Sequence, residues 1–530
     1  MPRREIKMSV ELIKESLVLN RGIKRECAQI IKEKDLIVPD GKPDMKKVLQ
    51  MDGKLDIEQI EVQQDRIVYK GKMDLAVLYV PESNPMSICT MKGTIPLEDF
   101  MMVEGIDKDH AVKLSYSMEH LHWNILNERK LNVKAIIQLE VNASESQTAH
   151  VTVDCESDEP IQTQTQEVCF SKKGNLKEEK MILKDDLAVP TGKPDIGEVL
   201  KTEIKISDIE IRRTDEEIFY SGNLNIATLY KEQNNEENME MMFHKIPFSN
   251  AVEYIREDNE AFFDCELSIA QQYVQVIPNL DGEDRILETE VVLKVETSTI
   301  SSVRAEIIGD IYCPGKSVAI TDQTDEFINL LHKTDTCMPR KETITFEETA
   351  PDNEAVYSIC MRSIVEEKVI KENQLEIKGI VDVKVTYITQ EAAQKLGYTN
   401  TAIPFSQTIE IEGINKDSIP MVVSKVEDVT LLTQGKREFV VEFKICNKVE
   451  VYHKQPLYIL EGVELYDIDM EDLKKLPSMT VYTVKKGDSY WSIAKRYNTT
   501  IDEILELNEI DLSTELHPGQ KIMILKKRID

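Results

Sequence analysis

The sequence predicts a mainly β protein with short helices, built as three tandem β-rich repeat domains followed by a small βααβ domain. Three observations lead to this fold class. Pro-Asp, glycine and proline positions recur three times with the same spacing. Apolar residues alternate with polar ones after each recurring glycine, as in strands with one buried face. Near the C-terminus, two short stretches of helical periodicity stand between two short strands.

The internal repeat organises the first 455 residues. The segment VPDGKPD at residues 38–44 recurs as VPTGKPD at residues 189–195. In each copy a Pro-Asp pair is followed 27 residues later by a glycine, and a proline comes 25 residues after that glycine. The anchors are Asp44, Gly71 and Pro96, then Asp195, Gly222 and Pro247, then Asp352, Gly379 and Pro404. The identical spacing indicates three copies of one domain.

Each copy is expected to consist mainly of antiparallel strands. The strand that follows the glycine has apolar residues at every second position, and so has the last strand of each copy. In the first set these residues are Met73, Leu75, Val77 and Tyr79; Leu224, Ile226, Thr228 and Tyr230; and Val381, Val383, Val385 and Tyr387. In the second set they are Leu131, Val133, Ala135, Ile137 and Leu139; Leu287, Thr289, Val291, Leu293 and Val295; and Phe439, Val441, Phe443 and Ile445. Such alternation is typical of antiparallel sheets with one covered face.

The repeat also predicts where the domains begin and end. The expected limits are 10–145, 160–300 and 340–454 for the three repeat units and 479–526 for the C-terminal domain. Segments rich in polar residues, proline or charge are expected to be linkers, and they lie near 145–160, 301–340 and 455–478.

One short helix is expected in each unit after the Pro-Asp pair, where Asp44 or Asp195 could cap it. The third copy departs from the other two at this point, because residues 346–350 replace the Val-Pro-x-Gly-Lys element. We therefore expect the third unit to have the same sheet topology with an altered first turn.

The C-terminal domain shows its four elements in order. A short alternating strand contains Val481 and Thr483, and a helix of period 3.6 places Tyr490, Ile493, Ala494 and Tyr497 on one side. Residues 500–503, TIDE, form a capping-box pattern for a second helix. Pro518-Gly519 turns the chain into a last strand at residues 522–525.

Charge and composition limit the classes of partner. The chain has 530 residues and a formal net charge of −31. This charge argues against nucleic acid, which requires a basic face, and against anionic membrane surfaces. No stretch approaches the roughly 18 apolar residues needed to span a bilayer, and the N-terminus has no apolar run of signal-peptide length. Nine scattered cysteines indicate reduced thiols in a cytosol rather than a disulfide framework.

No pattern in the sequence predicts an enzyme. Gly41-Lys42 and Gly192-Lys193 precede proline, which lacks the N–H and hydroxyl that a phosphate loop needs. His120 and His122 are two ligands without a third, too few for a zinc site, and are expected to be surface residues. Catalytic signatures of hydrolases and metalloproteases are absent. We therefore expect no catalytic residues, no metal and no cofactor.

The C-terminal residues quoted above closely resemble a LysM domain, a module that elsewhere binds N-acetylglucosamine polymers such as peptidoglycan and chitin. The resemblance implies a shallow ligand groove between the loop after the first strand and the loop after the second helix. Its residues here are Gly487, Asp488, Ser489 and Tyr490, and then Asn508, Glu509, Ile510 and Asp511. Trp491 follows the first loop, and we expect it to be an exposed anchor for a partner protein.

Three repeat copies followed by a LysM domain resemble the SipL-like family of clostridial spore-coat morphogenetic proteins. The resemblance implies a non-enzymatic scaffold, made in the mother cell and located at the forespore surface. Its expected partners are the coat-basement ATPase of the spore, bound through the LysM domain, and other coat proteins. The alternative is a cell-wall or cortex protein whose LysM domain binds peptidoglycan while the repeats act as spacers.

Overall fold

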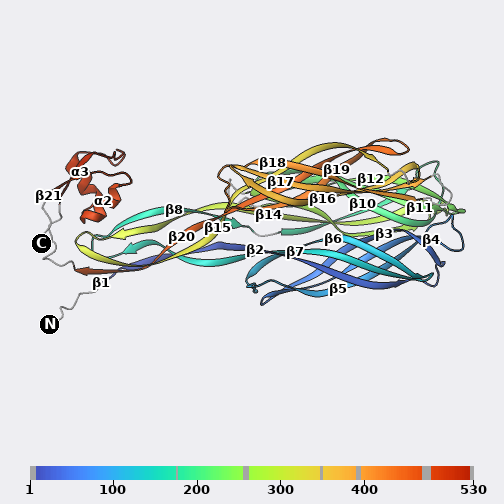
Figure 1. Ribbon diagram of the computed structural model, residues 1–530, viewed down its shortest axis with the longest axis horizontal. Coiled ribbons are helices and arrows are strands. Elements are labelled where there is room, and N and C mark those ends of the chain that lie inside the picture. Colours follow the sequence, from blue (N-terminus) through green and yellow to red (C-terminus); the bar gives the residue numbers. More distant parts are fainter. Residues whose placement is uncertain are drawn as a thin grey trace.

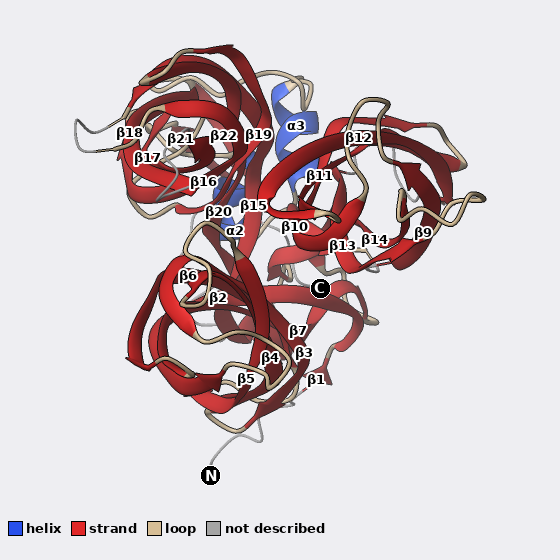
Figure 2. Ribbon diagram, turned by 90° about the vertical axis from the view of Figure 1, so that its right-hand side faces the viewer, coloured by secondary structure: helices blue, strands red, loops and turns tan. Residues whose placement is uncertain are grey.

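The computed structural model describes residues 8–174, 177–254, 262–346, 350–389, 396–467 and 479–525. Three β-sandwiches lie side by side at one end of an elongated molecule (Figure 1). A stalk of long strands extends from them, and the two helices lie at its far end. Viewed along the long axis, the sandwiches appear as three lobes (Figure 2). The expected fold class, mainly β with short helices, is confirmed.

Each sandwich consists of two three-stranded antiparallel sheets in the same strand order. In the first unit the sheets are β2 (Glu11–Ile37), β7 (Lys130–Glu156) and β6 (His110–Asn127), and β3 (Met45–Gln63), β4 (Arg66–Pro81) and β5 (Cys89–Met102). In the second they are β9 (Lys177–Ala188), β14 (Ile286–Tyr312) and β13 (Phe262–Ile277), and β10 (Ile196–Arg213), β11 (Glu217–Glu232) and β12 (Asn235–Glu253). In the third they are β15 (Lys316–Thr345), β20 (Glu438–Asp467) and β19 (Ile419–Gln434), and β16 (Asn353–Lys371), β17 (Gln374–Thr389) and β18 (Leu396–Glu410).

The third unit therefore has the sheet topology of the other two, as its sequence predicted. The altered first turn expected at residues 346–350 includes residues 347–349, which lie outside the described part of the chain. The alternating residues of the central strands, from Met73 to Tyr387 and from Leu131 to Ile445, are all buried. They form one apolar core in each sandwich.

The anchor glycines lie where a neighbouring strand bulges toward them. A Cβ atom on Gly71 would lie 2.2 Å from the carbonyl oxygen of Asp56, and one on Gly379 would lie 2.1 Å from that of Ile364. The strand pairing shifts register opposite both glycines. The anchor prolines lie in β5, β12 and β18, which pair on only one side. A proline is tolerated there because an edge strand needs fewer N–H donors.

The anchor aspartates pair with arginines instead of capping helices. Arg129 lies 2.6 Å from Asp44, Arg285 lies 2.6 Å from Asp195, and Arg437 lies 3.6 Å from Asp352. The prediction of a helix after Asp44 and Asp195 is wrong, because β3 and β10 begin there. The adjacent apolar residues of each strand are instead divided between two cores. Val48 packs in the core of its own sandwich, and Leu49 packs in a separate cluster with Leu200.

The stalk is built from the extended halves of long strands. Residues 11–20 pair with 146–156, residues 162–173 with 300–312, and residues 316–330 with 452–467. Strand β8 (Gln162–Lys173) and the two-residue strand β1 (Met8–Ser9) belong to it. Its core combines Val151 of β7, Phe170 of β8 and Phe327 of β15.

These pairings correct the expected linkers. The described residues of the segments 145–160, 301–340 and 455–478 lie mostly in β7, β14, β15 and β20, and residues 468–478 lie outside the described chain. Polar residues are frequent in these segments because only one face of each strand is buried. Apolar residues such as Val151 and Leu457 occupy that face.

The cysteine prediction is wrong for one pair. Cys337 of β15 and Cys446 of β20 are paired in register and form a disulfide, the one found among the described residues. They are 109 residues apart in sequence, so their pairing could not be seen without the sheet register. In the described residues, no helix is long and apolar enough to cross a membrane.

Candidate functional site

The LysM domain has the predicted order of elements. Strand β21 (Met479–Thr483) is followed by helices α2 (Tyr490–Tyr497) and α3 (Ile501–Asn508) and by strand β22 (Lys521–Leu525). Both helices begin with a capping box, Ser489 with Ser492 and Thr500 with Glu503. In each box the cap hydroxyl accepts a backbone N–H of the first turn, which fixes where the helix starts.

The first predicted binding loop is held by its own side chains. The Asp488 carboxylate accepts hydrogen bonds of 2.7 Å from the Tyr482 hydroxyl and from the Lys485 backbone N–H. The Tyr482 bond, together with that of Lys485, lowers the pKa of Asp488 below its ordinary value. Gly487 has φ 91°, a conformation that favours glycine. Asp488 and Ser489 thus shape this loop, and the exposed members Gly487 and Ser489 remain available to a ligand.

Tyr490 connects the first loop to the chain beyond the second. Its ring is buried, and its hydroxyl donates to the backbone carbonyl of Thr514 over 3.0 Å. Burial raises the pKa of this hydroxyl. Tyr490 of the first loop therefore contacts the segment that follows the second loop.

The second predicted loop is also anchored from within. Asn508 exchanges two hydrogen bonds of 2.7 Å with the backbone of Met523 in β22. Glu509 ends α3 in the left-handed conformation, and Ile510 packs against the core. Asp511 accepts a 3.0 Å hydrogen bond from the Ser513 backbone N–H, which lowers the pKa of Asp511. Glu509 and Asp511 are exposed, so this loop presents two carboxylates to solvent.

The prediction that Trp491 is exposed is wrong. Only 9% of the residue is accessible, because its indole lies between the LysM domain and the end of the stalk. Nε1 donates a 2.8 Å hydrogen bond to Asp310, and the ring meets Tyr312 edge to face at a centroid distance of 4.8 Å. Trp491 therefore binds the end of β14 in the same chain, and its indole is not exposed to a partner protein.

Further contacts complete this stalk–LysM interface. The Tyr312 hydroxyl donates to the Thr499 carbonyl over 2.9 Å, and Lys495 lies 2.5 Å from Asp310. Burial acts to raise the pKa of Asp310, but hydrogen bonds from Lys495 and Trp491 outweigh it and lower that pKa. Burial raises the pKa of Tyr312 to about 12. The domain is thus fixed by apolar, charged and hydrogen-bonded contacts together.

The sequence interpretation missed an exposed apolar face on the domain. Met479 pairs with Leu525 and Val481 with Met523 across β21 and β22, and all four side chains are exposed. Their neighbours Tyr482, Ile522 and Ile524 point to the opposite face and are buried. The alternation M-T-V-Y-T is a signal for this face, since a two-stranded sheet covered on one side leaves the other side in solvent.

The predicted histidine pair has the expected surface position. His120 and His122 are exposed on β6, with ring centroids 5.7 Å apart. Over the described ranges, the one group of three potential metal ligands is Cys337, Glu427 and Cys446, and it includes neither histidine.

Comparison with known families agrees with both parts of the chain. The LysM domain family matches residues 482–524. The SipL SPOCS domain family matches three segments, 44–126, 195–272 and 352–432, one in each sandwich. No solved structure matches the chain.

Similarity to curated proteins is confined to short segments. A chlorophenol reductase of Desulfitobacterium hafniense is 41% identical over 54 residues, which are 10% of this chain and 16% of that protein. The N-acetylmuramoyl-L-alanine amidase sle1 of Staphylococcus epidermidis is 48% identical over 50 residues, 9% of this chain and 15% of that protein. The chain spans about a sixth of the length of these relatives. Its family assignment rests on the domain matches: the chain is SipL-like, with three tandem SPOCS domains and a C-terminal LysM domain.

Proposed function

We propose that the protein is a non-enzymatic scaffold for spore-coat assembly, made in the mother cell and acting at the forespore surface. In this proposal the LysM domain binds the coat-basement ATPase, and the SPOCS sandwiches recruit or pack against other coat proteins. SPOCS and LysM domains are non-catalytic families, and the SPOCS family belongs to spore-coat proteins.

The observation that carries this proposal is the position of the LysM domain. It is fixed at the end of the stalk by Trp491, Asp310 and Tyr312, while the three sandwiches lie at the other end (Figure 1). A molecule with different binding surfaces at two separated ends is suited to hold two kinds of partner at once.

Two surfaces of the LysM domain remain candidates for the ATPase contact. One is formed by the two loops with the exposed residues Gly487, Ser489, Glu509 and Asp511. The other is the apolar face of Met479, Val481, Met523 and Leu525. Apolar side chains at the centre of an interface contribute most of its binding energy, with charged residues at its rim.

A second candidate function is peptidoglycan binding. LysM modules bind such polymers, and one relative with a similar segment is named an N-acetylmuramoyl-L-alanine amidase. In that function the two loops would bind N-acetyl groups by backbone hydrogen bonds and apolar contact, with the sandwiches as spacers.

We propose that the domain limits 10–145, 160–300, 340–454 and 479–526 separate three sandwiches and the LysM domain, and that the stalk strands are shared between units. The separate apolar cores of the three sandwiches and of the LysM domain support this division, and residues such as Phe327 belong to stalk strands that continue beyond the limits.

The test compares two partners of the full-length protein, the purified coat-basement ATPase and insoluble peptidoglycan. We expect binding to the ATPase and none to peptidoglycan. Two double variants then locate the contact, Glu509→Lys/Asp511→Lys in the loop and Val481→Thr/Met523→Thr on the apolar face. Each changes exposed side chains on a different surface, so each is the matched control of the other. Binding to peptidoglycan alone, abolished by the loop variant, would establish the second function instead.

A further inference from the structure

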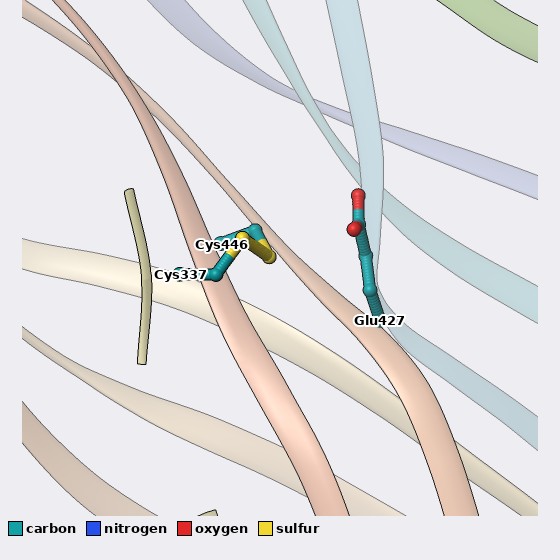
Figure 3. Close-up of side chains that lie close together, drawn as sticks. All are labelled: Cys337, Glu427 and Cys446. Atoms are coloured by element: carbon teal, nitrogen blue, oxygen red, sulfur yellow. A yellow bond between two sulfur atoms is a disulfide. The ribbon is translucent and has the colours of Figure 1, made fainter. Parts of the chain in front are cut away.

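The third sandwich carries a cluster of potential metal ligands on three neighbouring strands. Cys337 on β15 and Cys446 on β20 are directly opposed, with Cα atoms 4.0 Å apart. Glu427 lies on β19, the other neighbour of β20. The two sulfur atoms and a Glu427 carboxylate oxygen all lie within 4.8 Å of one another (Figure 3). Cys337 and Glu427 are exposed, so the cluster is open to solvent.

The fold does not require cysteines at this position. The arginines that pair with the anchor aspartates, Arg129, Arg285 and Arg437, mark equivalent positions in the three units. Cys446 stands nine residues after Arg437. At the same distance from the other two arginines the cross-strand pairs are Gln29 with Gln138 and Lys180 with Lys294. Two sandwiches of the same topology thus form with amides or ammonium groups in place of the sulfurs. The chemistry of the cysteine pair is particular to the third unit.

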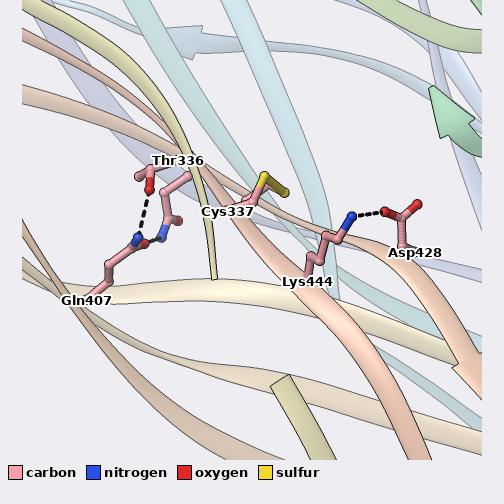
Figure 4. The surroundings of a disulfide bond; sticks show 7 residues. Thr336, Cys337, Gln407, Asp428 and Lys444 are labelled. Atoms are coloured by element: carbon pink, nitrogen blue, oxygen red, sulfur yellow. Dashed lines mark hydrogen bonds and ion pairs between the residues drawn. A yellow bond between two sulfur atoms is a disulfide. The ribbon is translucent and has the colours of Figure 1, made fainter. Parts of the chain in front are cut away.

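Glu427 has no cationic partner among the described residues. Its neighbour Lys425 pairs with Glu266 of the second unit, and Lys444 pairs with Asp428 over 2.7 Å (Figure 4). Both lysines lie near Glu427, but their ion pairs are with other carboxylates. The Glu427 carboxylate therefore has oxygen atoms that are free to bind a cation.

We propose that the reduced third unit binds a thiophilic divalent cation such as Zn²⁺ through Cys337, Cys446 and Glu427, with water in the remaining coordination position. Zinc binds thiolate at about 2.3 Å and carboxylate at about 2.0–2.2 Å, which places tetrahedral ligand atoms roughly 3.5 Å apart. The sulfur atoms and the carboxylate oxygen already lie within 4.8 Å of one another, so all three can reach one cation once the S–S bond is broken.

The disulfide and the metal exclude each other. A dithiol reductant supplies two electrons and two protons, the S–S bond breaks to give two thiols, and the reductant becomes a disulfide. The cation then displaces the two thiol protons as the sulfurs bind it as thiolates. In both states β15 and β20 are joined at the same register position, by a covalent bond or by a metal. The redox state and the metal concentration of the surroundings thus decide whether the site holds a disulfide or a metal ion.

The test uses Co²⁺ as a spectroscopic probe on the full-length protein after reduction and removal of the reductant. We expect thiolate-to-cobalt charge-transfer absorption that saturates at one equivalent and that Zn²⁺ abolishes. The oxidised protein should give none. Cys337→Ser/Cys446→Ser should remove the absorption, whereas Cys27→Ser/Cys360→Ser, which changes two other exposed cysteines, should retain it.

Glu427→Gln tests the third ligand without touching the sulfurs. It should weaken Co²⁺ binding about tenfold or more, because changes to groups around a metal typically cost that much. Circular dichroism of every variant establishes that the sandwiches are folded. Absorption that persists in Cys337→Ser/Cys446→Ser, absorption absent from the reduced wild type, or unchanged affinity in Glu427→Gln would each overturn the proposed ligand set.

Discussion

Replacing Asp310 by alanine is expected to loosen the LysM domain from the stalk. Asp310 accepts the Trp491 Nε1–H over 2.8 Å and pairs with Lys495 over 2.5 Å. Its removal leaves the indole N–H buried at the interface without an acceptor. The perturbation lies on the stalk, so it changes no residue of the LysM core.

The magnitude follows from these two contacts. A hydrogen bond to a charged group contributes about 1.5–3 kcal/mol, and a partly exposed ion pair such as that of Lys495 adds about 0–1 kcal/mol. We therefore expect a loss of about 2–3 kcal/mol in the free energy that holds Trp491 at the interface, roughly 30–150-fold in the equilibrium constant.

The chain supplies its own reporter, because it has two tryptophans. Trp123 is exposed on β6, and in a Trp123→Phe background the emission comes from Trp491 alone. Urea titration of this emission should show the transition at lower urea in Asp310→Ala. Asp325→Ala is the matched control, since Asp325 pairs with Arg21 within the stalk. The same midpoint in both variants would refute the assigned role of Asp310.

Three further outcomes are expected. Gly379→Ala should lower the free energy of unfolding by about 1–3 kcal/mol in denaturant titration, because the new Cβ would lie 2.1 Å from the Ile364 carbonyl oxygen. Gly462→Ala is the control and should be near neutral, since its Cβ would have its nearest contact at 3.7 Å. The Asp310 contribution to docking should be complete above the ordinary aspartate pKa of about 3.9 and lost as the pH falls through the lowered pKa of the docked state; loss of docking near neutral pH would contradict this sign. Limited proteolysis should leave residues 146–156 and 300–312 uncut, since both are paired stalk strands; early cleavage there would show that the stalk is open.

The parts of the fold that the sequence predicted depend on local patterns. Met73, Leu75, Val77 and Tyr79 alternate, and a strand with one buried face is the structure that this pattern favours. The spacing from Asp44 to Gly71 recurs because each anchor meets a fixed neighbour, an arginine or a bulge. The capping box at Thr500 is contained within four residues. Each of these features is determined within one unit.

The parts that the sequence did not predict depend on contacts between distant segments. Trp491 and Asp310 are separated by 181 residues, and nothing near either residue indicates the other. A tryptophan beside a polar turn has the same local sequence whether it faces solvent or a second domain. The helix expected after Asp44 failed for a related reason, since Val48 and Leu49 are adjacent apolar residues in either structure and the pairing of β3 with β4 decides between them.

The stalk makes the three units interdependent, which bears on the choice between the two functions. Phe170 of the second unit and Phe327 of the third pack in one core with Val151 of the first, so removing any unit exposes apolar surface of the others. β14 then continues from the second sandwich to Asp310 and Tyr312, the contacts that fix the LysM domain. A spacer for a glycan-binding module requires length and no fixed orientation. A tether must instead hold the three sandwiches in a constant orientation relative to the LysM domain. The shared stalk core and the docked LysM domain provide such an orientation, and they therefore favour the scaffold function.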